Sequence, residues 1–316
     1  MDDNLYENLQ GWVPNPAAVE RAAAIEGELE TYASHLFGSE RKNTYLWEPL
    51  LKVKPDWRRG AQGIGDCVSW GTELAATCLM AIQHVQGNEK FEAEAATESI
   101  YGGCRVEVLN KRSGGWSDGA FGYAAAKWLN EYGVLLRRDY SQETGNDEHN
   151  LLKYSKTKAK NWGNYGCGGR FDKGELDKLA KRMPVKKIVR VKTLDGCESA
   201  ILNWYPVTIA SMAGFGRRKD SNGVIRRSGR WAHLMVILGV CWINGKRYWR
   251  IFNSWGTSVS GPDPLVESKA VQDCSWWATD SDVAWILRSG DCWALADVEG
   301  MPKRELDFDS IAGAWS

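Results

Sequence analysis

The stretch QGIGDCVSWG at residues 62–71 places one cysteine, Cys67, at the expected first turn of an apolar helix. A thiol there is a candidate nucleophile, because the helix dipole and the free N–H groups of the first turn favour thiolate and lower the pKa. Such a thiolate needs a histidine to exchange protons with, and a third polar group to orient that histidine. The other interpretations of Cys67 are a buried thiol, a metal ligand and one half of a disulfide bond.

The four histidines differ in how well they could serve that thiol. His35 lies in the N-terminal part of the chain, and His149 lies in a polar connection. His84 is on the same expected helix as Cys67, about 25 Å further along, which is too far to reach it. His233 begins a strongly apolar strand, where a polar residue needs a specific reason. His233 is therefore the candidate base, with a buried structural histidine as the alternative.

Asn253, in the segment FNSWGTS, is the candidate for the orienting group. It follows His233 by one β-hairpin, whose turn carries the Asn-Gly pair at residues 244–245 that is typical of tight hairpins. The two strands should therefore bring His233 and Asn253 to the same end of the sheet. An asparagine oxygen that accepts from the imidazole N–H would fix the tautomer without adding charge.

The elements that must position these residues fall into two halves. Helical periodicity predicts helices over 16–37, 67–86, 94–109 and 120–133, and the second of these has an apolar face wide enough for a central, buried helix. Asp66 is the expected N-cap of that second helix.

The second half of the chain is expected to be mostly strand. Residues 141–185 are polar, and they predict an irregular connection with one short helix near 174–182. β-branched and aromatic runs separated by turn residues then predict strands. A helical half followed by a strand-rich half gives an α+β fold with two facing lobes. The expected strands cover residues 185–191, 205–212, 233–243 and 247–255.

Composition narrows the function classes. The chain has 316 residues, 43% hydrophobic and 25% charged, so it can form a sizeable core. Lys+Arg and Asp+Glu both number 40, so the formal net charge is zero and gives no indication of a polyanionic partner. The N-terminus MDDNLYENLQ lacks signal-peptide character, and no apolar run is long enough to span a membrane. Without an export signal, the eight cysteines are expected to be reduced thiols. Because they form no CxxC pair, no structural metal site is expected, and no cofactor is expected either.

Several segments, in the right order, resemble papain-like (C1-type) cysteine peptidases. The likeness covers roughly residues 56–290, and the Cys, His and Asn segments follow one another in the order of that family's known signature. Their separations from Cys67, 166 and 186 residues, exceed the usual separation of about 130–150 residues, and the excess fits an insertion in 141–185 and a longer hairpin at 214–231. It would make the chain a divergent member from a bacterium or a phage. The segments are DWRRGAQGIGDCVSW, SGGWSDGAFGYAAAKWLNEYGV, ESAILNWYPVTIASM and HLMVILGVCWINGKRYWRIFNSWGTS.

The resemblance implies a two-lobe fold with the active-site cleft between a helical lobe and an antiparallel, β-barrel-like lobe. The expected domains are an N-terminal extension at 1–55, a papain-like domain at 56–300 with lobes at about 56–165 and 185–295, and a C-terminal tail at 301–316.

Roles carried over from the resemblance define a cysteine endopeptidase. Cys67 would be the nucleophile, His233 the general base and acid, and Asn253 the residue that orients His233. Gln62 would donate to the oxyanion together with the Cys67 N–H group. Trp255 would shield the His–Asn hydrogen bond from water.

The same resemblance implies a substrate-binding loop. Gly114 and Gly115 would pair with the substrate backbone, and Trp116 would line the adjacent side-chain pocket.

Departures from the family pattern keep two alternatives open. Val68 stands where a tryptophan is usual, the interval from Gln62 to Cys67 is one residue short, and Asp66 places a carboxylate beside the thiol, which would raise its pKa. One alternative is a weak or inactive papain-like structural protein of a larger, virion-type assembly. The other is a Cys-His amidase or endopeptidase that cleaves peptidoglycan.

Partners and location follow from these readings. A polypeptide substrate is expected, and residues 1–55 are expected to be a structural or docking element for an assembly partner, with an inhibitory pro-segment as the alternative. The basic segment 215–231 is expected to be a solvated hairpin, or else a positive rim on the cleft. No membrane or nucleic-acid partner is expected, and the predicted location is cytoplasmic or virion.

Overall fold

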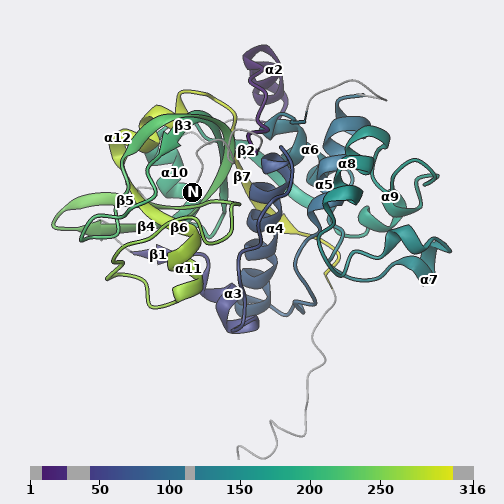
Figure 1. Cartoon of the computed structure of the whole chain (residues 1–316), viewed down its shortest axis with the longest axis horizontal. Coiled ribbons are helices and arrows are strands. Elements are labelled where there is room, and N and C mark those ends of the chain that lie inside the picture. Colours follow the sequence, from purple (N-terminus) through teal and green to yellow (C-terminus); the bar gives the residue numbers. More distant parts are fainter. Residues whose placement is uncertain (1–8, 27–42, 111–117, 302–316) are drawn as a thin grey trace, which may run out of the picture.

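The computed structural model describes residues 9–26, 43–110 and 118–301. A curled antiparallel sheet lies on one side and a group of helices on the other, with helix α4 (Cys67–Gln86) running between them (Figure 1). The expected mixed fold with a helical half and a strand-rich half is therefore confirmed.

The helical lobe comes mostly from the first half of the chain, and the remaining helices pack around the sheet. The described helices are α2 (Pro16–Glu26), α3 (Glu48–Val53), α4, α5 (Thr97–Gly103), the π-helical turn η1 (Cys104–Val108), α6 (Gly122–Glu131), α7 (Ser141–Thr144), the 3-10 turn η2 (Asp147–His149), α8 (Lys156–Tyr165), α9 (Glu175–Ala180), α10 (Leu194–Leu202), α11 (Lys269–Cys274) and α12 (Asp280–Leu287).

The sheet is antiparallel throughout, in the order β2-β7-β3-β4-β5-β6, with β1 paired to β4. Since β2 and β6 stand at opposite ends of this order, the sheet curls without closing into a barrel. The strands are β1 (Thr44–Tyr45), β2 (Val185–Arg190), β3 (Val207–Phe215), β4 (Arg227–Ile243), β5 (Lys246–Phe252), β6 (Ser275–Thr279) and β7 (Cys292–Val298).

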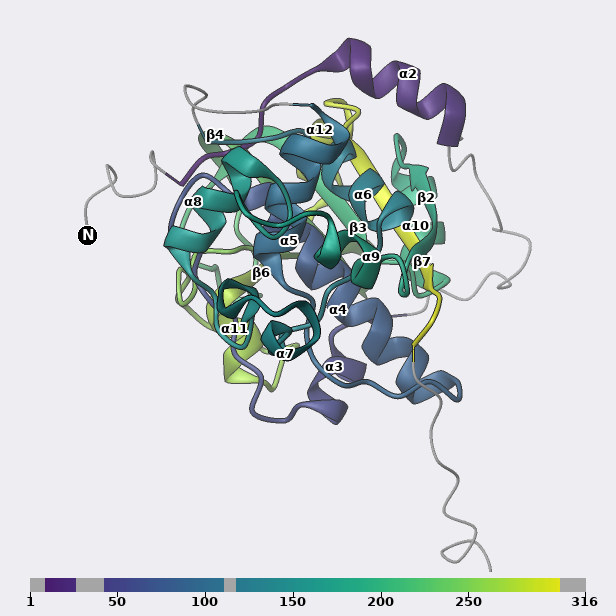
Figure 2. The ribbon, with the colours of Figure 1, turned by 90° about the vertical axis from the view of Figure 1, so that its right-hand side faces the viewer.

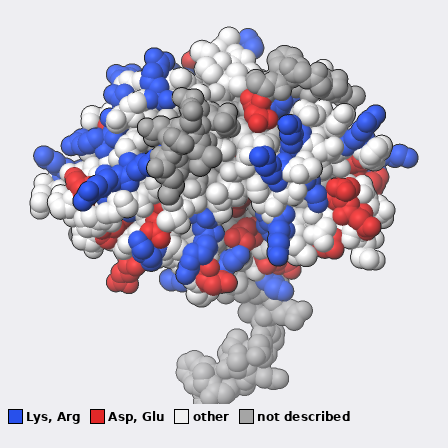
Figure 3. Space-filling view, viewed as in Figure 1, with Lys and Arg blue, Asp and Glu red and all other residues white. Residues whose placement is uncertain are grey.

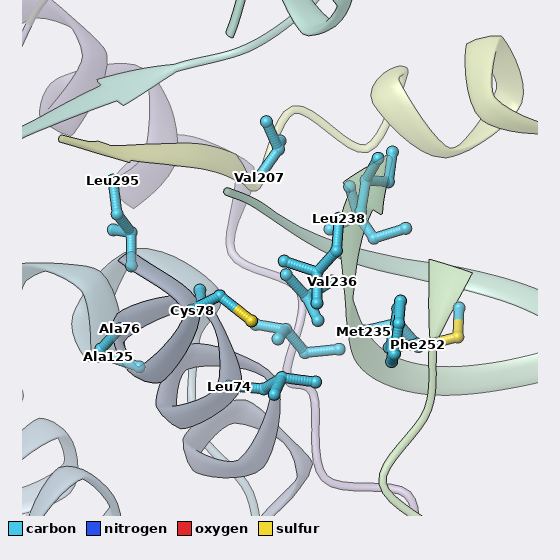
Figure 4. Packing of buried hydrophobic residues seen from close by; sticks show 14 of the residues in the cluster. Leu74, Ala76, Cys78, Ala125, Val207, Met235, Val236, Leu238, Phe252 and Leu295 are labelled. Atoms are coloured by element: carbon cyan, nitrogen blue, oxygen red, sulfur yellow. The ribbon is translucent and has the colours of Figure 1, made fainter. Parts of the chain in front are cut away.

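Helix α4 is the central element, as its wide apolar face predicts. Every residue from Cys67 to Ile82 is buried. Figure 4 shows Leu74 and Cys78 of α4 near Val236 and Leu238 of strand β4. This buried apolar contact joins the middle of α4 to β4, the strand that also carries the candidate His233.

The β4–β5 hairpin turns at Asn244 and Gly245, as predicted. Both residues have positive φ, 49° and 75°, which an Asn-Gly pair adopts readily. A register shift lies between Ile237 and Gly239 on β4. The turn and this bulge together set which residues meet at the far end of the hairpin.

The expected helix over 94–109 is shorter than its periodicity suggests. Ala95 pairs with Leu136 in an isolated bridge, and the Ala96 N–H bonds to Leu135. This pairing holds the segment extended until Thr97, where α5 begins.

The polar connection contains a helix that the sequence analysis missed. α8 is capped by Ser155, whose hydroxyl accepts from the Lys158 N–H. Gly163 lets α8 approach α5 closely, because a Cβ there would lie 2.6 Å from the Tyr101 ring. The helix depends on this packing, because a short polar segment is a marginal helix on its own.

The basic segment 215–231 is only partly a solvated hairpin. β3 and β4 extend into it, and Arg226 and Arg227 are exposed. Lys219 instead points inward and forms a buried ion pair with Asp263 at 2.6 Å.

The N-terminal helix α2 lies on the outside of the molecule, beside β2 (Figure 2). Its Glu20 accepts two hydrogen bonds from Arg190, at 2.9 and 2.7 Å. Figure 3 shows basic and acidic side chains interspersed over the face it displays. Among the described residues, no helix has the length and apolarity to cross a membrane.

Candidate active site

Cys67 begins α4 at the junction of the two lobes. A Cβ on Gly71, one turn later, would lie 2.3 Å from the Leu234 side chain, so glycine lets the helix press against β4. The backbone N–H of Leu234 consequently faces the sulfur of Cys67. The thiol is fully buried, next to the residue that follows His233.

His233 and Asn253 are joined as the hairpin argument predicts. His233 Nε2 lies 2.7 Å from Asn253 Oδ1. That oxygen also accepts from the Ser254 N–H at 2.7 Å, which assigns the amide orientation. Nε2 must therefore carry the proton, and Nδ1 is left as the basic nitrogen of a neutral ring. Nδ1 is buried and has no hydrogen-bond partner among the described residues.

Two tryptophans cover the histidine. The Trp255 ring lies 4.6 Å from the His233 ring, centroid to centroid. Trp231 packs against Trp255 at 4.7 Å and approaches the imidazole edge-on at 6.5 Å. The position of Trp255 fits the shielding role implied by the family resemblance. Trp231 was not singled out in the sequence, although its position two residues before His233 on the same strand face would have signalled it.

Gln62 reaches the same place from the loop before α4. Its backbone N–H donates to the backbone carbonyl oxygen of Ser254 at 2.9 Å, and its side-chain oxygen accepts from the Ser254 hydroxyl. Its Nε2 donates to the carbonyls of Leu9 and Ile64, at 2.7 and 2.8 Å. The structure thus brings Gln62, Cys67, His233 and Asn253 together despite the short interval between the first two.

Residues Leu9–Val13, which we call the covering segment, lie across this site. The N–H groups of Gly11 and Trp12 both donate to the Ala232 oxygen, at 3.1 and 3.0 Å. The Gly11 N–H also faces the sulfur of Cys67. No side chain would fit at Gly11, because a Cβ would lie 1.8 Å from the Gly65 oxygen.

On the helical side, the covering segment pairs with Ala120. The Val13 N–H donates to the Ala120 oxygen, and the Ala120 N–H donates to the Gly11 oxygen, both at 2.9 Å. The expected substrate-loop residues Gly114, Gly115 and Trp116 lie outside the described residues. Ala120 was not predicted for this role, and its backbone pairing is visible only in three dimensions.

The covered site holds its two titratable groups neutral. Burial raises the pKa of Cys67 to about 12, and the neighbouring Asp66 charge adds to this effect. Burial lowers the pKa of His233 to about 4, although the Asn253 hydrogen bond opposes the shift. The expectation that the helix N-terminus would lower the thiol pKa is therefore wrong for this state, since desolvation outweighs the dipole.

Asp66 stands at the N-cap position of α4, as predicted, but its side chain makes no capping hydrogen bond. Its Oδ2 accepts instead from the Tyr154 hydroxyl at 3.0 Å and the Trp70 indole at 3.2 Å. Oδ1 is buried without a partner among the described residues. Burial raises the pKa of Asp66 to about 8.

This buried carboxyl makes a testable contribution to stability. A folded-state pKa raised from 3.8 to about 8 means that the acid form stabilises the fold below pH 4, and that this contribution is lost as the pH rises to 8. Asp66→Asn should remove this pH dependence of the stability, and at pH 9 its free energy of unfolding should exceed that of the wild type by at most roughly 5 kcal/mol. Melting temperatures from pH 4 to pH 9 measure it. Asp139→Asn, at an exposed carboxyl, is the control, and parallel curves for Asp66→Asn and the wild type would contradict the assignment.

The remaining candidates have structural partners. His84 Nδ1 contacts the loop after α4, at Glu89 and Phe91, and His149 bonds to Thr144. His35 lies outside the described residues. All eight cysteines are free and buried. Within the described ranges no group of three or more His, Cys, Asp or Glu side chains is arranged to hold a metal ion.

Comparison with solved structures identifies the architecture. Xylellain, a cysteine protease from Xylella fastidiosa, is 15% identical with a TM-score of 0.59, over 93% of this chain and 97% of the other. Procathepsin B from Trypanosoma congolense is 12% identical with a TM-score of 0.54, over 95% and 88%. The ragweed pollen cysteine protease Amb a 11, in its proform, is 12% identical with a TM-score of 0.54, over 94% and 77%.

These likenesses confirm the expected papain-like fold. At such low identity they establish the fold alone. No family model and no curated protein sequence is similar enough to match this chain.

Proposed function

We propose that this protein is a cysteine peptidase, with Cys67 as nucleophile and His233 as its proton acceptor. The observation that carries the proposal is the His233 ring. Its Nε2–H is committed to Asn253, and its buried Nδ1 has no hydrogen-bond partner among the described residues. The next residue on β4, Leu234, directs its backbone N–H at the Cys67 sulfur. A neutral imidazole held in that tautomer, next to a thiol, is the arrangement that nucleophilic catalysis needs.

The proposed reaction is acyl transfer. The Cys67 sulfur attacks the substrate carbonyl carbon, and its proton passes to Nδ1 of His233. The C–N bond then breaks as Nδ1 returns that proton to the leaving amine, which leaves a thioester. Water, deprotonated by Nδ1, cleaves the thioester and restores the thiol.

Gln62 is proposed to stabilise the oxyanion. Its Nε2 donates to the Leu9 carbonyl in the covered state, and that group is chemically the same as a substrate peptide carbonyl. A substrate that displaces the covering segment would find this N–H already oriented. The backbone N–H of Cys67 is the expected second donor.

The covering segment is proposed to hold the enzyme latent. It satisfies Gln62, and it buries the thiol under Gly11. This supports the inhibitory interpretation of the N-terminal extension over the docking interpretation. Uncovering would restore water to the site and remove the desolvation that now keeps Cys67 and His233 neutral.

The inactive structural protein remains the second candidate, because a fully buried, neutral thiol is also what a scaffold would contain. A peptidoglycan-cleaving enzyme, virion association and a binding partner for residues 1–55 stay predictions. A polypeptide substrate agrees with the solved proteases of this fold.

Hydrolysis of a quenched-fluorescent protein substrate tests the proposal, on the full chain and on the Gly11→Ala variant discussed below. Cys67→Ser and His233→Ala should each abolish the signal, while Asn253→Ala should lower it roughly 10- to 100-fold. Exposed-site Lys178→Ala is the matched control and should have no effect. Hydrolysis that persists in Cys67→Ser would refute the proposal, and complete inactivity of an uncovered, folded chain would favour the scaffold.

A further inference from the structure

One phenolic hydroxyl ties together the two ends of the loop between Gln62 and Cys67, which we call the oxyanion loop. The Tyr154 hydroxyl donates to Asp66 Oδ2 at 3.0 Å and accepts from the Gly63 N–H at 3.1 Å. Gly63 directly follows Gln62, and Asp66 directly precedes Cys67. Each of the two proposed oxyanion donors, the Gln62 side chain and the Cys67 N–H, therefore stands next to a residue that Tyr154 holds.

The peptide between these two anchors orients the Gln62 amide. The Ile64 carbonyl accepts from Gln62 Nε2 at 2.8 Å and from the Asp66 N–H, also at 2.8 Å. A shift of the loop would move this carbonyl, and the Gln62 amide would turn with it. The other acceptor of Nε2 is the Leu9 carbonyl, which belongs to the covering segment and would leave when the site opens. Ile64 would then be the residue that still orients this amide.

Asp66 is also fixed from the side of α4. Its Oδ2 accepts from the Trp70 indole at 3.2 Å, and its backbone carbonyl accepts from the Ser69 hydroxyl at 2.8 Å. The Trp70 ring packs edge-on against the Tyr154 ring, with 5.0 Å between the ring centroids. Because Asp66 is 0% exposed, water cannot replace a lost donor, so without the Tyr154 hydroxyl the loop would be held from one side only.

Tyr154 reaches the loop from the polar connection, just before α8. The next residue, Ser155, caps α8 and donates its own backbone N–H to Glu98 Oε1 at 2.8 Å. Glu98 lies fully buried on α5. The start of α8 also presses on the loop, because a Cβ on Gly63 would lie 3.2 Å from the Lys156 side chain, which is tighter than ordinary contact. The connection therefore supports the loop from a helix start that is itself anchored to α5.

We propose that Tyr154 and Asp66 form a positioning pair that holds the oxyanion loop, so that its two N–H donors point at the same substrate oxygen. This rests on the proposed peptidase function. An oxyanion donor is effective when its N–H is aimed before the charge develops, and this loop has no regular secondary structure of its own to aim it. Tyr154 supplies the support from 88 positions beyond Asp66.

The first experiment measures the loop without any turnover. Amide hydrogen exchange is followed by mass spectrometry on the full chain, over peptides that cover residues 61–66. Tyr154→Phe removes only the hydroxyl, so the Gly63 N–H loses its acceptor, and exchange in these peptides should become at least roughly tenfold faster. Tyr140→Phe is the matched control, since the Tyr140 hydroxyl also accepts a backbone N–H, from Leu136 at 2.8 Å.

The control should leave exchange in the oxyanion loop unchanged, and both variants should keep wild-type exchange in peptides from the middle of α4, which shows that they are folded. Equal exchange of the loop in Tyr154→Phe and Tyr140→Phe would overturn the proposal.

The second experiment measures turnover of the quenched-fluorescent substrate in the Gly11→Ala background. Tyr154→Phe should lower kcat roughly 10- to 100-fold and leave KM within about twofold, because the oxyanion donors act in the transition state. Tyr140→Phe should keep kcat, although it also loses one buried hydroxyl. Asp66→Asn still offers an oxygen to Tyr154, so it should retain most of the kcat that Asp66→Ala loses.

The two losses should not add. Asp66→Ala and Tyr154→Phe remove the same link, so the double variant should have about the kcat of Asp66→Ala alone. An unchanged kcat in Tyr154→Phe, or a double loss equal to the product of the single losses, would overturn the proposal. If no substrate is cut in the Gly11→Ala background, the peptidase function fails, while hydrogen exchange still decides whether Tyr154 holds the loop.

Discussion

Gly11→Ala should raise the rate of Cys67 alkylation roughly 100-fold. A Cβ at this position would lie 1.8 Å from the Gly65 oxygen and 2.4 Å from its carbon. Both obstacles are backbone atoms, so no side-chain rotation relieves the clash, and the covering segment must move away. Loss of two or three of its backbone hydrogen bonds is worth about 2–3 kcal/mol, which corresponds to that factor. Iodoacetamide labelling mapped by mass spectrometry measures the rate.

The matched control for this variant is Gly216→Ala. A Cβ on Gly216 would meet only Ile225 at 3.5 Å, an ordinary contact. It should therefore leave the labelling of Cys67 unchanged. If Gly11→Ala labels no faster than Gly216→Ala while both keep the wild-type circular dichroism, the covering segment does not control access to the thiol.

Arg59→Met should destabilise the fold by about 3–5 kcal/mol. Arg59 is a buried clamp that donates to Glu73 at 2.7 Å, to the Trp70 oxygen at 2.7 Å and to the Asn253 oxygen at 3.0 Å. Burial raises the pKa of Glu73, and Arg59 opposes that shift. Removal of the guanidinium leaves Glu73 buried without its counter-charge. A fall in melting temperature of roughly 10 °C would report the loss.

The same clamp links α4, which carries Cys67, to Asn253, which is hydrogen-bonded to His233. Its charge also contributes to the low pKa of His233, so Arg59→Met should raise that pKa in a histidine NMR titration. Arg59→Met/Glu73→Gln should regain much of the stability, because no buried charge is then unpaired. Lys178→Ala, which breaks an exposed pair with Glu175, should change stability by less than about 0.5 kcal/mol. Similar losses for the Arg59 and Lys178 variants would contradict the clamp.

Local sequence patterns predicted the parts of the site that depend on neighbouring residues. Apolar periodicity set α4 at Cys67–Gln86, because a helix buried on most sides must be apolar on most sides. The Asn-Gly pair set the β4–β5 turn, and the turn brought His233 and Asn253 to one end of the sheet. Both features can be predicted locally, because helical periodicity and a tight-turn residue pair are each contained in a short stretch of sequence.

Other features escaped prediction because remote contacts decide them. The sequence alone predicts no helix at α8. Ser155 caps it, and its polar residues form a helix through packing against α5. Asp66 has the residue type of an N-cap, yet the hydroxyl of Tyr154 competes for its carboxylate. The basic segment around Lys219 predicts a solvated charge, but Lys219 is buried in an ion pair with Asp263.

Residue types and spacing alone were enough to pick out the side chains that could do chemistry: a cysteine at a helix start, a strand histidine and an asparagine one hairpin later. The protonation state of these side chains depends on contacts made in the folded chain. The covering segment, more than 50 positions from Cys67, excludes water and keeps the thiol neutral, with a pKa of about 12. Tyr154 meets Asp66 across 88 positions. Protonation and the position of the oxyanion loop depend on burial and on partners from distant segments, and no local pattern encodes these.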